Sequence, residues 1–114
     1  MLSDIDIKTR SQIEFIDITS QVQGVIDKSG IKEGVCSVYV PHTTAAVTIN
    51  ENADPDVIRD IITRLNEIVP LNGNYRHTEG NSAAHIKSII IGASETVFIK
   101  DGRLILGTWQ SIFF

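Results

Sequence analysis

The sequence predicts one α+β domain, in which a mostly antiparallel sheet or sandwich carries two main covering helices. Segments near both ends of the chain alternate polar and apolar residues, which is typical of half-buried strands. Between them, residues 55–68 carry apolar side chains at helical spacing. The length of 114 residues allows one hydrophobic core. Strands at both ends with helices between them favour the α+β class.

The first quarter of the chain predicts two strands and a helix. Residues 4–8 and 13–17 both alternate with period two, and we expect them to form a hairpin. Thr19 is the expected N-cap of a helix whose apolar residues are three and four apart. Gly30 is expected to end this helix, because glycine readily adopts the left-handed conformation found there.

Two more strands and the clearest helix follow. Residues 35–40 and 45–50 read as strands joined by a Pro-His-Thr-Thr connection. Asp54 then stands where an N-cap is expected, and Pro55 occupies the first helical position, where a missing N–H has no cost. Pro70 ends the apolar periodicity, since proline cannot continue a helix.

The remaining segments predict a loop, a short helix and three strands. Residues 71–81 are polar and rich in turn formers, so we expect a long loop. Ser82 is the expected cap of a short helix that ends at Gly92. Residues 97–100 and 103–106 are predicted strands, joined in a hairpin by a two-residue turn. Residues 108–114 form a last predicted strand, and we expect its Trp109 to lie in the core.

Composition and charge narrow the function classes. The net charge is −4 and no run of basic residues occurs, which argues against a nucleic-acid partner. No segment is long and apolar enough to predict a membrane span, and no signal peptide is evident, so we expect a cytoplasmic protein. The single cysteine, Cys36, cannot form an internal disulfide and is expected to be a small buried residue.

Three histidines are the first candidates for chemistry. His42 lies in the connection between two predicted strands, His77 in the long loop, and His85 near the start of the short helix. Neutral imidazole binds zinc and related metals, and three protein ligands with one open position form a catalytic arrangement. The spacing matches no tight metal motif, so structural histidines on the surface remain an alternative.

Carboxylates and amides stand beside these histidines. Glu51 and Asn52 follow a predicted strand, where functional side chains often project. Asp54 is better explained as a helix cap than as a ligand. Glu79 and Asn81 flank a glycine in the polar loop, and glycine lets the backbone approach a ligand closely. This segment is either part of a site or an ordinary polar loop.

Four ordered motifs resemble the YjbQ-like family. They are residues 41–46, 50–57, 77–85 and 107–110, and the resemblance runs over nearly the whole chain. It implies a compact α+β sandwich that assembles as a homotrimer. It also implies a weak thiamine-phosphate synthase activity, which joins hydroxymethylpyrimidine pyrophosphate to thiazole phosphate, with a small-molecule substrate and a divalent metal ion, zinc or magnesium.

The resemblance, together with the reaction that it implies, leads to expected roles for individual residues. Family chains continue past the Trp-Gln strand into an acidic tail, so we expect residues 1–114 to be a single domain without that tail. Lys87 is a further possible phosphate contact, although its position on the helix should point it away from His85. The expected metal ligands are His42, His77 and His85, the expected catalytic residues are Glu51, His77 and Glu79, and the expected substrate-binding residues are Asn52, Asn81 and Arg76.

Two other functions stay open from the residues alone. The same histidines suit a metal-dependent hydrolase that activates water. They also suit a non-catalytic trimeric module that binds a metabolite or a metal. A hydrolase would turn over small molecules, whereas a binding module would only be stabilised by its ligand.

Overall fold

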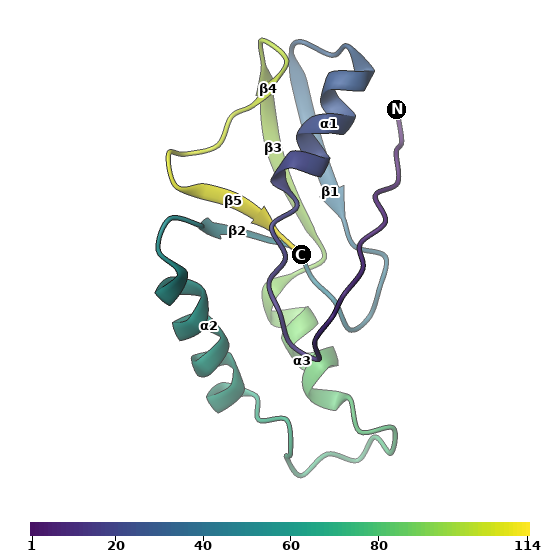
Figure 1. Cartoon of the computed structure of the whole chain (residues 1–114). Coiled ribbons are helices and arrows are strands. Elements are labelled where there is room, and N and C mark those ends of the chain that lie inside the picture. The colour runs from purple at the N-terminus through teal and green to yellow at the C-terminus, as the bar shows by residue number, and fades with distance from the viewer.

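The computed structural model describes all 114 residues and shows an α+β fold with three helices and two small antiparallel sheets (Figure 1). One sheet has the strand order β1-β3-β4, and the other pairs β2 with β5. The elements are α1 (Thr19–Ser29), β1 (Gly34–Tyr39), β2 (Thr48–Glu51), α2 (Pro55–Ile68), α3 (Ser82–Ile91), β3 (Ser94–Lys100), β4 (Arg103–Leu104) and β5 (Gln110–Phe113).

The core lies between α1 and the inner side chains of the strands. Val22 and Ile26 of α1 pack in one cluster with Val97 and Ile99 of β3 and with Ile112 of β5. Gly30 ends α1 with φ 72°, the left-handed conformation expected there. Only 11 of the 114 residues are buried, so this core is small for the length of the chain.

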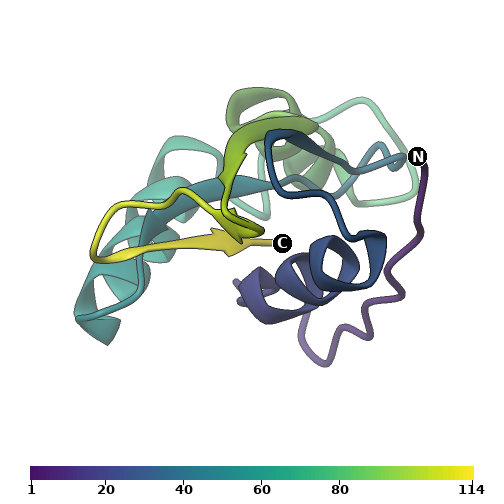
Figure 2. The same cartoon turned by 90° about the horizontal axis from the view of Figure 1, so that it is seen from above.

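Helix α2 forms as predicted but does not cover a sheet within the single chain. Its bounds agree with the proline at each end, yet none of its residues is buried. Figure 2 shows α1 and α2 on opposite sides of the view, with β5 running between them. The predicted covering role is therefore confirmed for α1, which contributes to the core, and is wrong for α2 in a single chain.

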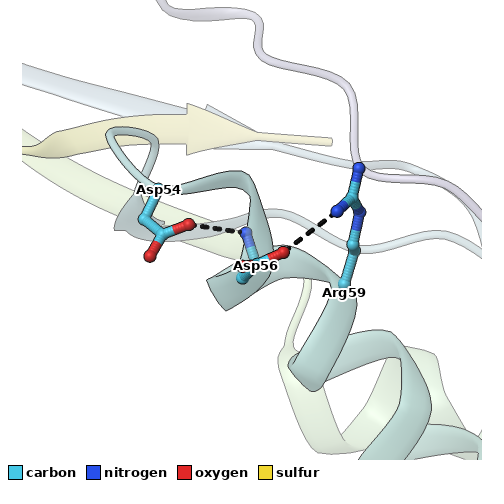
Figure 3. A network of polar contacts seen from close by, with 3 residues as sticks. All are labelled: Asp54, Asp56 and Arg59. Atoms are coloured by element: carbon cyan, nitrogen blue, oxygen red, sulfur yellow. Dashed lines mark hydrogen bonds and ion pairs between the residues drawn. The ribbon is translucent and has the colours of Figure 1, made fainter.

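The N-cap of α2 makes a testable contribution to stability. The Asp54 side chain accepts a hydrogen bond of 2.9 Å from the amide N–H of Asp56, whose carboxylate in turn pairs with Arg59 (Figure 3). We expect Asp54→Ala to lower the free energy of unfolding by about 1 kcal/mol, because the mutation leaves a helix N–H without its partner. Urea unfolding checks this, with the exposed mid-helix Asp60→Ala as control; equal losses in the two variants would contradict the cap assignment.

The predicted hairpin near the C-terminus is confirmed. Asp101 and Gly102 both have positive φ, 52° and 74°, as a tight turn with left-handed central residues requires. Lys100 lies opposite Arg103. β4 is shorter than predicted, although the Ile105 N–H still donates to the Phe98 carbonyl before the chain leaves the sheet.

The predicted N-terminal hairpin is wrong. Residues 4–8 are extended without strand pairing, although Ile5 and Ile7 do pack against the core. Residues 16–18 pair instead with the end of the chain: the Ile16 N–H donates to the Phe114 carbonyl at 2.8 Å, and Asp17 lies opposite Phe113. The alternation correctly indicates which side chains turn inward, but it does not specify the partner strand.

Two predicted caps are also wrong. Thr19 is the first residue of α1 rather than its cap, because its hydroxyl accepts a hydrogen bond from the Ile112 N–H at 2.8 Å. The carboxylate of Asp17 accepts from the Thr19 N–H instead. Asn81, not Ser82, precedes α3, and no side chain caps that helix.

Trp109 lies on the surface, with 65% of its side chain exposed, so its predicted place in the core is wrong. Strand β5 begins only at Gln110, and the side-chain oxygen of Gln110 accepts a hydrogen bond of 2.7 Å from the Gly107 N–H. This contact closes a turn that directs Trp109 outward. β2 likewise begins later than predicted, at Thr48.

Cys36 is half-buried on β1 and packs against the core, as expected of a small apolar residue. Burial raises the pKa of its thiol, since the thiolate loses solvation. None of the helices combines the length and the apolar character needed to cross a bilayer.

Candidate functional site

The structure brings two of the three histidines together. His77 lies exposed in the loop that precedes α3, and His85 is half-buried on α3 itself. Their ring centroids are 5.6 Å apart and their planes are nearly perpendicular, at 84°. The seven residues between them fold into a turn and the start of the helix, which returns the chain to within contact distance.

This ring separation suits two imidazoles that bind one ion. With a metal–nitrogen distance near 2.1 Å and a tetrahedral angle, the two ring centres would lie about 5 Å apart. An edge-to-face aromatic contact gives a similar separation, so the pair is also stable without an ion. No group of three His, Cys, Asp or Glu side chains within one chain is placed to hold a metal ion. In a single chain, therefore, only two of the three expected metal ligands lie near each other.

Polar side chains from the same loop surround the start of α3. The Asn81 amide donates a hydrogen bond of 2.8 Å to the Glu79 carboxylate. Arg76 is exposed next to His77 in the sequence. The first turn of a helix has N–H groups without partners inside the helix. Arg76 and the N-terminus of α3 therefore bring a cation and free N–H groups into one short segment. This arrangement favours the binding of anions.

His42 lies elsewhere in the single chain. It is exposed in the connection from β1 to β2 and lines a cavity between α1 and the N-terminal residues 1–7. That cavity contains neither His77 nor His85. The third expected metal ligand thus belongs to a different part of the chain surface.

Glu51 and Asn52 lie at the opposite end of α2 from His77. The helix has 14 residues, a length of about 21 Å, and Figure 1 shows the β2–α2 connection at one end and the loop to α3 beyond the other. The Glu51 carboxylate accepts from the Asp54 N–H, and the Asn52 amide donates to Asp17. Both side chains stabilise this connection in the single chain.

Lys87 points away from His85, as its spacing predicts, because two residues rotate about 200° around a helix. Its ammonium group donates to the Asn66 side-chain oxygen at 2.5 Å, which ties α3 to α2. Partial burial lowers the pKa of Lys87.

Trp109 is a candidate site residue that the sequence reasoning placed in the core. With Glu51, Thr108 and Gln110 it lines an open hollow of about 520 Å³ at the end of the β2–β5 pair. An exposed indole beside a carboxylate can stack on a flat ring. The Gly-Thr-Trp-Gln segment could have predicted the exposed position of Trp109. A tryptophan in a turn does not follow the alternation that directs strand side chains into the core.

The chain is thus an α+β protein with two small antiparallel sheets and a histidine pair at the start of its third helix. The chain belongs to the UPF0047, YjbQ-like family, whose model matches residues 3–114. It is 54% identical to the UPF0047 protein MJ1081 of Methanocaldococcus jannaschii, over 100% of this chain and 83% of that protein. It is 51% identical to YugU of Bacillus subtilis, over 100% of this chain and 87% of YugU.

Solved structures share this fold. An uncharacterised YjbQ/UPF0047-family protein from Clostridium acetobutylicum superposes with a TM-score of 0.92 at 52% identity, covering 95% of this chain and 84% of the other. A YbjQ-like protein of unknown function from Sulfolobus solfataricus gives 0.89 at 37% identity, covering 94% of this chain and 78% of the other.

Proposed function

We propose that the protein is a metal-dependent enzyme with weak thiamine-phosphate synthase activity, and that its site forms between the chains of a homotrimer. The observation that carries the proposal is the His77–His85 pair, with ring centroids 5.6 Å apart. Arg76, Glu79 and Asn81 from the same loop supply a cation, an acid and an amide next to this pair. Zinc or magnesium is the proposed metal, and the substrates are small molecules.

The open shape of the single chain supports assembly. Its radius of gyration is 15.5 Å, against about 13 Å for a compact domain of this length. Thirteen large apolar residues are exposed, among them Ile89 at 83% and Phe98 at 68%. Val35 and Phe98 lie opposite each other on the outer face of the β1–β3 pair, where they form an apolar patch. Such patches typically mark interfaces, and packing of these faces would give the sandwich expected of the family.

A neighbouring chain would also complete the site. We propose that His42 of one copy joins His77 and His85 of another as the third metal ligand. Glu51, whose strand end lies far from His77 in the single chain, would approach a neighbouring histidine pair in the same way and act as a general base or hold a ligand in place. Asn52 and Asn81 would orient the substrate.

The proposed reaction forms a bond from the thiazole nitrogen to the pyrimidine methyl carbon and breaks the bond from that carbon to pyrophosphate. Negative charge grows on the leaving pyrophosphate. We propose that Arg76 and the N-terminal amides of α3 bind its oxygens, since Arg76 is exposed in the loop before that helix. A bound divalent cation would neutralise the remaining charge. Glu79 holds the Asn81 amide in one orientation through their 2.8 Å hydrogen bond.

A direct assay tests this function. We expect the purified protein, incubated with both thiamine precursors and zinc or magnesium, to form thiamine phosphate slowly, and the product to disappear with a chelator and in His77→Ala. Thr78→Ala, a neighbouring loop variant, should retain the activity. No product with the wild type would rule out the synthase. Release of phosphate without coupling would indicate a hydrolase, and thermal stabilisation by a precursor without any product would indicate a binding module.

A further inference from the structure

A third cavity, beside α3, has the features of a small-molecule site. It has a volume of about 570 Å³ and lies between the N-terminal segment 9–15, α3 and the end of β5. Figure 1 shows the N-terminal segment turning back beside α3 before it reaches α1. Small-molecule sites in proteins usually measure about 300–1,000 Å³. Much of the wall is apolar, with Ile13, Phe15, Leu65, Ile91, Phe113 and Phe114.

Lys87 is the only cationic side chain in the wall of this cavity. Its ammonium group has three N–H donors, and one of them is used by Asn66. Glu14 is the only acidic side chain, and its carboxylate already accepts hydrogen bonds of 2.9 Å from the Arg10 N–H and the Ser11 hydroxyl. Lys87 therefore keeps donors for a ligand while Glu14 is engaged within its own turn.

Asn81 supplies an acceptor without a partner. Its amide nitrogen must face Glu79, because a carboxylate only accepts hydrogen bonds. Its side-chain oxygen is consequently fixed, is inaccessible to water in the free chain, and receives no hydrogen bond. An acceptor in this state costs free energy unless something donates to it. Other atoms of Asn81 contribute to the cavity wall, but its side-chain oxygen has almost no accessible surface there, so the proposed ligand does not depend on it.

We propose that this cavity binds a small carboxylic acid with an apolar, aryl or alkyl body, whose carboxylate pairs with Lys87. A single ammonium group balances one negative charge, and the nearby Glu14 disfavours a dianion such as a phosphate monoester. No histidine lines the cavity, so the proposed ligand does not contact the proposed metal ligands.

Calorimetric titration of the full chain with 3-phenylpropionate tests this site. We expect binding that raises the melting temperature, with 3-phenylpropanol and phenyl phosphate both at least about tenfold weaker. Lys87→Met, which keeps the apolar stem, should weaken 3-phenylpropionate binding about tenfold. Lys28→Met, on the exposed end of α1, should leave it unchanged.

Three results would overturn the proposal: no binding of 3-phenylpropionate at millimolar concentration, equal binding of the alcohol, or tighter binding of phenyl phosphate. A folded Lys87→Met protein with undiminished affinity would also overturn it. If that variant does not fold, Ala84→Leu provides the second test, because the larger side chain occupies the cavity and leaves Lys87 in place. Unchanged binding in Ala84→Leu would locate the ligand elsewhere.

Discussion

Replacing Ile112 with alanine is expected to lower the free energy of unfolding by about 3–4 kcal/mol. Ile112 is fully buried in β5 and belongs to the one cluster that joins α1 to the strands. The loss combines the transfer free energy of the removed methyl and methylene groups with the cost of the cavity left behind. Because only 11 residues are buried, few neighbours can move in to fill that cavity.

Urea unfolding at one fixed protein concentration measures this effect, since association would otherwise change the apparent stability. Thr63→Ala is the control, because this residue is exposed on α2 and is not one of the exposed large apolar residues. Its expected loss in a single chain is within about 0.5 kcal/mol. A loss below about 1 kcal/mol for Ile112→Ala would contradict the position of β5 in the core.

Replacing His85 with alanine is expected to weaken metal binding by at least about 100-fold and to abolish metal-dependent turnover. His85 is the more enclosed of the two paired histidines and lies on a helix, so its loss leaves only His77, which is exposed in the loop before that helix. The helix should persist, since alanine favours helical conformation.

Competition between the protein and a chromogenic zinc chelator measures this affinity. Thr78→Ala, in the same loop, serves as the control and should bind zinc as the wild type does. His42→Ala should weaken zinc binding by a comparable factor, because His42 is the proposed third ligand from a neighbouring chain. Zinc affinity that is unchanged in His85→Ala would refute the assignment of the pair.

Local signals in the sequence predicted the elements that local chemistry determines. Asp54 and Pro55 determine where α2 begins, and Asp101-Gly102 determines the turn between β3 and β4. The pairing of residues 16–18 with the chain end was not predictable in this way, since it joins segments more than 90 positions apart. Thr19 shows the same limit, because its hydroxyl contacts Ile112 rather than its own helix.

The same distinction between local and long-range structure applies to the candidate site. His77 and His85 meet because the loop and the start of α3 return the chain over a short distance, so their proximity depends on local structure. The positions of His42 and Glu51 depend on the connection after β1 and on the length of α2, which separate them from that pair within one chain. Residue types alone could not predict that His42 and Glu51 lie apart from the His77–His85 pair within one chain.

Native mass spectrometry of untagged protein loaded with zinc most directly tests the claim that the His77–His85 pair is part of a metal site shared between chains. The proposal predicts a homotrimer that carries one zinc ion per chain. It also predicts that the ions are lost when the trimer dissociates, since a single chain supplies only two ligands. A monomer that retains zinc, or a homotrimer that takes up none, would contradict it.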